Sequence, residues 1–145
     1  MKWLDIPPLW LLLFAVTAWL SRSVVMAGSP YLSALGTGLV AGGLVTIALA
    51  AWEMYRHRTT IVPHMQPDAL VTTGPFAISR NPIYLADALI LLGLSLRWDA
   101  PIGVLLVPAF VWLITRRFIQ AEEARLSEHF GAAFDAYRRD TRRWL

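Results

Sequence analysis

Four stretches of apolar residues follow one another along the chain, and their lengths predict helices. They cover about residues 6–27, 31–53, 83–97 and 101–117. A hydrocarbon core needs roughly 20 residues of α-helix, so the first two stretches suit full transmembrane spans. The third and fourth are shorter, and flanking turns or a locally thinner bilayer would complete each crossing. The pattern predicts an all-α integral membrane protein, with four transmembrane helices in a single domain over residues 1–145.

The second stretch contains one pair of glycines at a spacing known from membrane helix interfaces. Gly38 and Gly42 form a G-x-x-x-G pair, which permits close approach between two helices. An ordinary small-residue packing face accounts for the same spacing without a specific partner. Both interpretations expect this side of the helix to pack against a neighbour.

Two polar regions interrupt and follow the apolar stretches. The loop of residues 56–82 is rich in proline, arginine and threonine, and irregular backbone of this kind lacks partners for its polar groups in lipid. Long ordered loops tend to be functional, so this loop is a candidate site. After residue 117, apolar residues recur at three- and four-residue steps between charged ones, which predicts a C-terminal amphipathic helix over 118–139.

The basic residues indicate the orientation of the chain. With four spans, 11 of the 13 lysines and arginines fall on the side that holds both termini and the loop, and only Arg22 and Arg97 fall on the other. Because basic residues concentrate on the cytoplasmic side of membrane proteins, both termini, the loop and the amphipathic helix are expected in the cytoplasm. The loop and the helix can therefore share a site.

Composition excludes several classes of protein. Apolar residues make up 57% of the chain and charged residues 16%, which disfavours soluble and disordered classes. The chain has no cysteine, so disulfides, thiolate metal sites and cysteine nucleophiles are excluded. Its three histidines show no metal-ligand spacing. The net charge of +3 does not indicate nucleic-acid binding, because the basic residues lie at the ends of apolar runs.

Three polar features are candidates for chemistry. The turn of residues 74–84 leads into a helix start at Pro82, which is either a capped junction or a site for an anionic group. Glu122 and Glu123 lie just beyond the last apolar stretch, where they either complement a helix dipole or bind a ligand. Asp87 lies within an apolar stretch, where it lines a site, lies near the interface or pairs with an arginine.

These features together resemble the isoprenylcysteine carboxyl methyltransferase family. The resemblance rests on Leu70-Val71-Thr72-Thr73-Gly74-Pro75-Phe76, on Arg80-Asn81-Pro82-Ile83-Tyr84, and on Glu122-Glu123 followed by Phe130-Gly131 and Tyr137. The wider group includes phospholipid N-methyltransferases and small-thiol methyltransferases. The matching pieces span about residues 68–139, which hold nearly all of the polar part of the chain.

The resemblance implies S-adenosyl-L-methionine in a cytoplasm-facing pocket that the C-terminal segment closes. Glu122 falls on the cofactor-binding carboxylate, with the ribose hydroxyls or the ammonium as its partner and Glu123 as its rival. The other residues that the resemblance assigns to cofactor binding are Asp68, Ala69, Leu70, Val71, Phe76, Asn81, Pro82, Ile83 and Tyr84. Arg80 and Asp87 are the candidate catalytic residues, and no metal is expected.

Departures from the family pattern leave the methyl acceptor open. Asn81 stands where the carboxyl methyltransferases usually have histidine, and an amide cannot act as a general base near neutral pH. Phe118 stands where the eukaryotic enzymes carry a substrate-side arginine. The expected acceptor is a lipophilic small molecule or a lipid that offers a carboxylate, an amine or a thiol, and Asp87 or Glu123 would be the base for the last two. A non-enzymatic membrane scaffold is the alternative outside enzymes.

Overall fold

The structure is a computed structural model that describes residues 6–23, 28–59 and 69–145. The described part is all-α, as the sequence predicts. Its elements in chain order are α1 (Pro7–Leu20), the 3-10 turn η2 (Ser21–Ser23), α2 (Pro30–Arg56), the 3-10 turn η3 (Gly74–Ala77), α3 (Pro82–Arg97), α4 (Pro101–Ile114), the π-helical turn η4 (Thr115–Ile119), α5 (Gln120–Phe130) and α6 (Ala132–Asp140). Proline begins α1, α2, α3 and α4, where its missing N–H is not needed.

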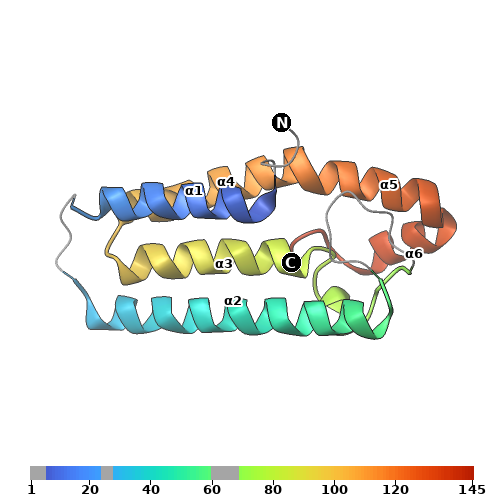
Figure 1. Cartoon of the computed structure of the whole chain (residues 1–145), viewed down its shortest axis with the longest axis horizontal. Helices are drawn as coiled ribbons and strands as arrows, with labels where there is room; N and C mark the ends of the chain where they lie inside the picture. Colours follow the sequence, from blue (N-terminus) through green and yellow to red (C-terminus); the bar gives the residue numbers. More distant parts are fainter. Residues whose placement is uncertain (1–5, 24–27, 60–68) are drawn as a thin grey trace.

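Helix α3 is the central helix of the bundle. It packs against α2 on one side and against α1 and α4 on the other (Figure 1). Leu91 of α3 is fully buried with Phe110 and Ile114 of α4 in the main apolar core. Lipid is as apolar as these side chains, so close packing stabilises such a core more than transfer out of water does.

Two glycines bring α2 and α3 into backbone contact. A Cβ atom added at Gly36 would lie 2.5 Å from the carbonyl oxygen of Gly93, and one added at Gly93 would lie 2.6 Å from that of Gly36. The predicted pair Gly38 and Gly42 has no neighbour within 4 Å of such an atom. The expectation that Gly38 and Gly42 form the packing face is therefore wrong, and the close approach uses another face of the same helix.

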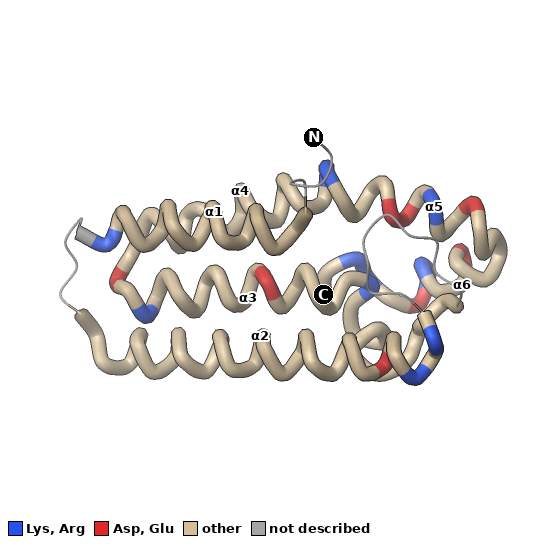
Figure 2. The backbone as a smooth tube through the Cα atoms, viewed as in Figure 1, with Lys and Arg blue, Asp and Glu red and all other residues tan. Residues whose placement is uncertain are grey.

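Charged residues gather at the two ends of the bundle. Figure 2 shows most of them at the end that carries α5 and α6, and few along the middle of the helices. The same end holds the start of α1, the end of α2 and the start of α3 (Figure 1). The loop after α2 and the C-terminal helices therefore meet, as the antiparallel order of the helices requires.

Two helical segments are long and apolar enough to cross a membrane. They are Pro30–Arg56 with 27 residues and the continuous segment Pro101–Phe130 with 30. Helix α1 has 14 residues where the sequence suggested 6–27, and residues 24–27 of that stretch lie outside the described residues. Helix α3 has 16 residues, close to the expected 83–97. Four crossings remain a prediction.

The C-terminal helix differs from the prediction of one amphipathic helix over 118–139. Helix α4 continues through η4 into α5, so the helix does not begin near residue 118. It ends at Gly131, whose φ of +49° suits a residue without a Cβ, and α6 then folds back. Glu122 and Glu123 thus lie within a continuous helix, and their interpretation as partners of a free helix dipole is wrong.

Candidate active site

A cavity of about 680 Å³ lies at the charged end of the bundle. That volume falls within the range of small-molecule sites in proteins. Most of its wall is apolar, and all the longer helices except α4 contribute to it. Its lining comes from α1 and the residue before it (Ile6, Pro7, Pro8), α2 (Ile47, Met54), the loop (Thr59, Ala69, Leu70, Val71, Phe76, Arg80, Asn81), α3 (Pro82, Ile83, Tyr84, Asp87), α5 (Glu122, Glu123, Arg125, Leu126) and α6 (Phe134, Tyr137).

The residues that the sequence singled out converge on this one cavity. Asp68 lies outside the described residues. Every other candidate lines the cavity: Ala69, Leu70, Val71, Phe76, Arg80, Asn81, Pro82, Ile83, Tyr84, Asp87 and Glu122. They come from the loop, α3 and α5, which are far apart in the sequence. The structure thus brings the separate motifs together, while the role of each residue stays a prediction.

Tyr84 and Glu122 connect α3 with α5 inside the cavity. The Tyr84 hydroxyl donates a hydrogen bond of 2.9 Å to Glu122 Oε1. Tyr84 is buried, because the first turn of α3 faces the centre of the bundle. This bond orients Glu122 along the cavity wall, and a carboxylate can accept hydrogen bonds from several donors.

Asp87 lies one helical turn beyond Tyr84, on the same face of α3. Its side chain is buried at 6% exposure and lines the cavity. The sequence left three interpretations of Asp87 open: lining a site, lying near the interface or pairing with an arginine. The structure supports the first, because Asp87 lines the cavity. A buried carboxylate at this depth is unfavourable unless a cation or hydrogen-bond donor meets it.

Two buried polar atoms of the cavity wall lack a hydrogen-bond partner among the described residues. They are Thr59 Oγ1 and Arg80 Nε. Buried polar groups in folded proteins nearly always have partners, so unpaired ones often mark the place of a ligand. Burial lowers the pKa of Arg80, and Glu123 raises it in part. An arginine remains charged under such a shift, so Arg80 offers the cavity a cationic donor.

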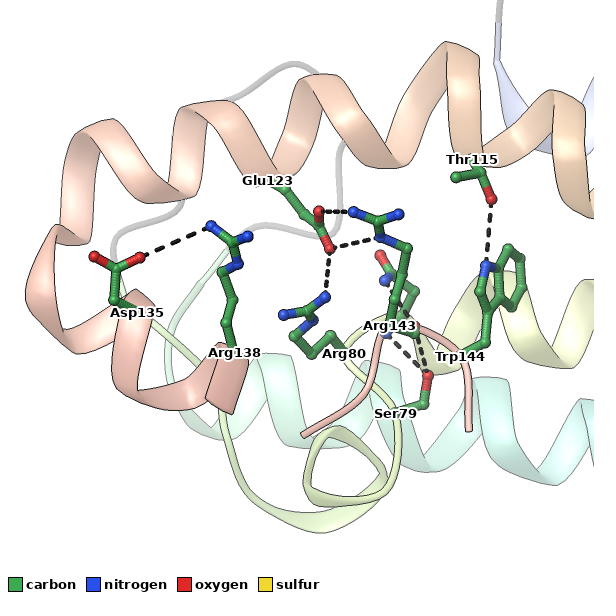
Figure 3. Close-up of polar contacts among 9 residues, drawn as sticks. Ser79, Arg80, Thr115, Glu123, Asp135, Arg138, Arg143 and Trp144 are labelled. Carbon is green, nitrogen blue, oxygen red and sulfur yellow. Dashed lines mark hydrogen bonds and ion pairs between the residues drawn. The ribbon is translucent and has the colours of Figure 1, made fainter. Parts of the chain in front are cut away.

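Glu123 differs from Glu122 in its partners. One oxygen of Glu123 accepts a bond of 3.0 Å from Arg143 Nε, and the other accepts one of 2.6 Å from Arg143 Nη2. Arg80 Nη2 lies 3.0 Å from Glu123 Oε1 (Figure 3). Two arginines thus occupy the oxygens of this carboxylate, and their contacts hold it in place. Both Asp87 and Glu123 line the cavity, and which of them would serve an amine or thiol acceptor as base stays a prediction.

Asn81 is held by the C-terminal end of the chain. Its side-chain amide donates a 3.0 Å bond to the carbonyl oxygen of Arg143, and its backbone N–H donates a 3.1 Å bond to Ser79 Oγ. Asn81 lines the cavity with 9% of its surface exposed. Its nitrogen thus has a partner within the protein, which the motif alone did not indicate.

Two further contacts fix the loop that carries the motif. Tyr137 of α6 donates a 2.6 Å bond to the carbonyl oxygen of Phe76, and burial raises the pKa of Tyr137. Thr73 Oγ1 donates to Glu53 Oε1, a buried carboxylate of α2. Sequence reasoning did not single out Glu53, Thr59 or Arg143. Glu53 and Arg143 lie in charged segments typical of solvated surfaces, and only their distant partners distinguish them.

An apolar helical bundle with a mostly apolar cavity at its charged end, lined by a few charged side chains, is typical of a membrane protein with a small-molecule site. A model of the phospholipid methyltransferase family matches residues 31–133, which is more than two thirds of the chain. The chain belongs to this family. It is therefore a membrane methyltransferase that uses S-adenosyl-L-methionine. The alternative of a non-enzymatic membrane scaffold is wrong.

The family match bears on the earlier resemblance. The phospholipid methyltransferase family belongs with the membrane methyltransferases that resemble the isoprenylcysteine enzymes, so the wider group is confirmed. The comparison with curated proteins and the comparison with solved structures each find no match. The matched region contains every candidate site residue, including Asp68.

Proposed function

We propose that this protein transfers a methyl group from S-adenosyl-L-methionine to the amine of a phospholipid-type acceptor, within the cavity described above. The observation that carries the proposal is that two carboxylates, those of Glu122 and Asp87, line the same mostly apolar cavity. Glu122 holds the cofactor and Asp87 faces the acceptor. The family's name supports a phospholipid as that acceptor.

The cavity suits the cofactor in its chemistry. S-adenosyl-L-methionine carries ribose hydroxyls, an ammonium, a carboxylate and an apolar base. Glu122 accepts hydrogen bonds from the hydroxyls or from the ammonium. Phe76, Leu70 and Val71 offer apolar surface to the nucleobase of the cofactor. Arg80 Nε, buried and without a partner among the described residues, suits an anionic group. When bound, the cofactor supplies an electrophilic methyl group on a sulfonium.

Asp87 gives an amine acceptor the base that it needs. An alkylammonium is not nucleophilic until it loses a proton, and the Asp87 carboxylate accepts that proton inside the cavity. The freed lone pair forms the new C–N bond while the C–S bond breaks and its electrons stay on sulfur. Apolar walls exclude water and align the reactants, which contributes much of the rate enhancement in such a site.

The acceptor reaches the cavity sideways from the bilayer in this proposal. Pro7 and Pro8 of α1 and Ile47 of α2 belong to the cavity wall, and α1 and α2 pack on opposite sides of α3. An amphipathic lipid then keeps its acyl chains in the membrane while its headgroup meets Asp87. Four crossings, with both termini and the cavity on the cytoplasmic side, complete the proposal and agree with the 11-to-2 distribution of basic residues.

A product analysis tests the acceptor. Membranes that contain the protein are incubated with methyl-labelled cofactor and phosphatidylethanolamine, and the lipids are extracted. We expect label in base-stable, mono- or dimethylated headgroups. Base-labile label would indicate methyl esters and hence a carboxylate acceptor, and label on an added thiol would indicate S-methylation. Either result overturns the amine proposal.

A further inference from the structure

We propose that the last five residues, Thr141–Leu145, form a strap that positions Arg80 and Asn81 in the cavity wall. Glu123 and Arg143 fasten this strap to α5. The inference rests on the proposed cofactor site, because the strap acts on residues that line it. The strap lies beyond the region 31–133 that matches the family, so the family match does not assign it a role.

Backbone carbonyls of the strap hold the turn before α3. The N–H of Arg80 donates a 2.9 Å bond to the carbonyl of Arg142. Ser79 Oγ and the Asn81 amide donate bonds of 3.2 and 3.0 Å to the carbonyl of Arg143. Three consecutive residues of the turn therefore depend on two carbonyls of the strap. Ser79 and Asn81 are buried, so nearby water does not readily replace these acceptors.

Two side chains of the strap fix its position against α5 and the π-helical turn. Arg143 makes a bidentate contact with Glu123 at 3.0 and 2.6 Å, the geometry that gives arginine pairs both strength and direction. Trp144 Nε1 donates a 3.2 Å bond to Thr115 Oγ1, at the π-helical turn (Figure 3). The strap is thus attached to the helix that carries Glu122, and to the turn that carries Arg80 and Asn81.

Glu123 joins the two arginines of this cluster. Its hydrogen bonds raise the pKa of Arg143, while burial lowers the pKa of Arg80 and repulsion from Arg143 adds to that lowering. The side chains of Glu123 and Arg80 are only 12% and 10% exposed, so their interaction is weakly screened by water. Removal of Arg143 leaves the Arg80–Glu123 pair intact but releases the strap. Removal of Glu123 leaves two arginines facing each other.

The test measures cofactor binding and methyl transfer on the full-length protein in detergent. Arg143→Gln is compared with Arg139→Gln, which makes the same charge change at an exposed position of α6. We expect Arg143→Gln to raise the Kd and the KM for S-adenosyl-L-methionine about tenfold, because one charge-assisted contact is lost. At saturating cofactor kcat stays within about twofold, because Asp87 is untouched. Arg139→Gln leaves all three unchanged.

Two more variants separate positioning from folding. Arg143→Lys keeps the charge without the bidentate geometry and is expected to recover part of the affinity. Glu123→Gln is expected to weaken binding more than Arg143→Gln does. Two results would overturn the strap. One is an equal loss of binding in Arg143→Gln, Arg143→Lys and Glu123→Gln together with a lowered Tm of the ligand-free protein. The other is an unchanged Kd for Arg143→Gln. If Glu122→Gln also leaves binding unchanged, the proposed cofactor site fails as well.

Discussion

Tyr84 of α3 donates a 2.9 Å hydrogen bond to Glu122 of α5, across 38 residues of sequence. This bond joins the motif at the start of α3 to the carboxylate that follows the last apolar stretch. It directs one oxygen of Glu122 toward α3 and keeps the side chain along the cavity. The turn just before α3 is also joined to α5 through Arg80 and Glu123, so a second contact holds the start of α3 against α5.

Glu122→Gln is expected to weaken S-adenosyl-L-methionine binding about tenfold or more. A charge-assisted contact to a ligand contributes about 1.5–3 kcal/mol, and about 1.4 kcal/mol corresponds to a factor of ten in affinity. Calorimetry on detergent-purified protein measures the effect, with Glu128→Gln as the control on an exposed position of the same helix. Equal binding by wild type and Glu122→Gln would place the cofactor elsewhere.

Asp87→Asn is expected to lower the rate of methyl transfer about 100-fold or more, because general-base catalysis contributes about 10²–10⁴-fold. Cofactor affinity should change by less than about threefold, since asparagine keeps the shape of the side chain. The control is Asp99→Asn, at the opposite end of the bundle. Steady-state kinetics with a lipid acceptor measure both quantities. A rate that is unchanged would leave Asp87 a packing role only.

Asn81→His is expected to retain cofactor binding. Histidine Nδ1 lies about as far from the backbone as the asparagine amide, so a protonated ring nitrogen can donate to the Arg143 carbonyl as Nδ2 does. Asn81→Leu has no donor and is expected to weaken binding, because it leaves that carbonyl with one donor fewer. Loss of binding by Asn81→His in a protein that folds normally would show that this position does not follow the family pattern.

Gly36→Ala is expected to destabilise the bundle by about 1–3 kcal/mol, as overpacking of a filled interface does. Its new methyl group would lie 2.5 Å from a backbone oxygen of α3. Gly38→Ala is the matched control in the same helix, since nothing lies within 4 Å of its new atom and alanine favours helix. Thermal unfolding in detergent compares the two. A lower Tm for Gly38→Ala than for Gly36→Ala would contradict this helix packing.

Reporter fusions at Ser29 and at Asp99 test the four crossings and their orientation. Both positions lie at the end of the bundle opposite α5 and α6, and a fusion at the C-terminus supplies the comparison. We expect both internal fusions to report the far side of the membrane and the C-terminal fusion to report the cytoplasm. A cytoplasmic signal from either internal position rejects this topology.

The length and polarity of the segments were enough to predict the main helices, and the motifs identified half of the residues that line the cavity. Apolar runs of these lengths form helices because every backbone group must find a partner within its own segment in lipid. The order of the runs is antiparallel, so the polar loop and the C-terminal part had to meet at one end. The candidate residues of the loop and of the first turn of α3 line the cavity for that reason. These outcomes depend on local polarity and length, which a sequence displays directly.

Which side chains face one another across the helices depends on the three-dimensional packing. A π-helical turn holds one residue more than an α-helical turn, and each residue turns an α-helix by about 100°, so η4 sets the faces that Glu122 and Glu123 present. Glu122 therefore meets Tyr84, while Glu123 meets Arg80 and Arg143. Likewise Gly36 rather than Gly38 touches α3. Such pairings join residues far apart in the chain, and they depend on helix rotation and packing that no local pattern encodes.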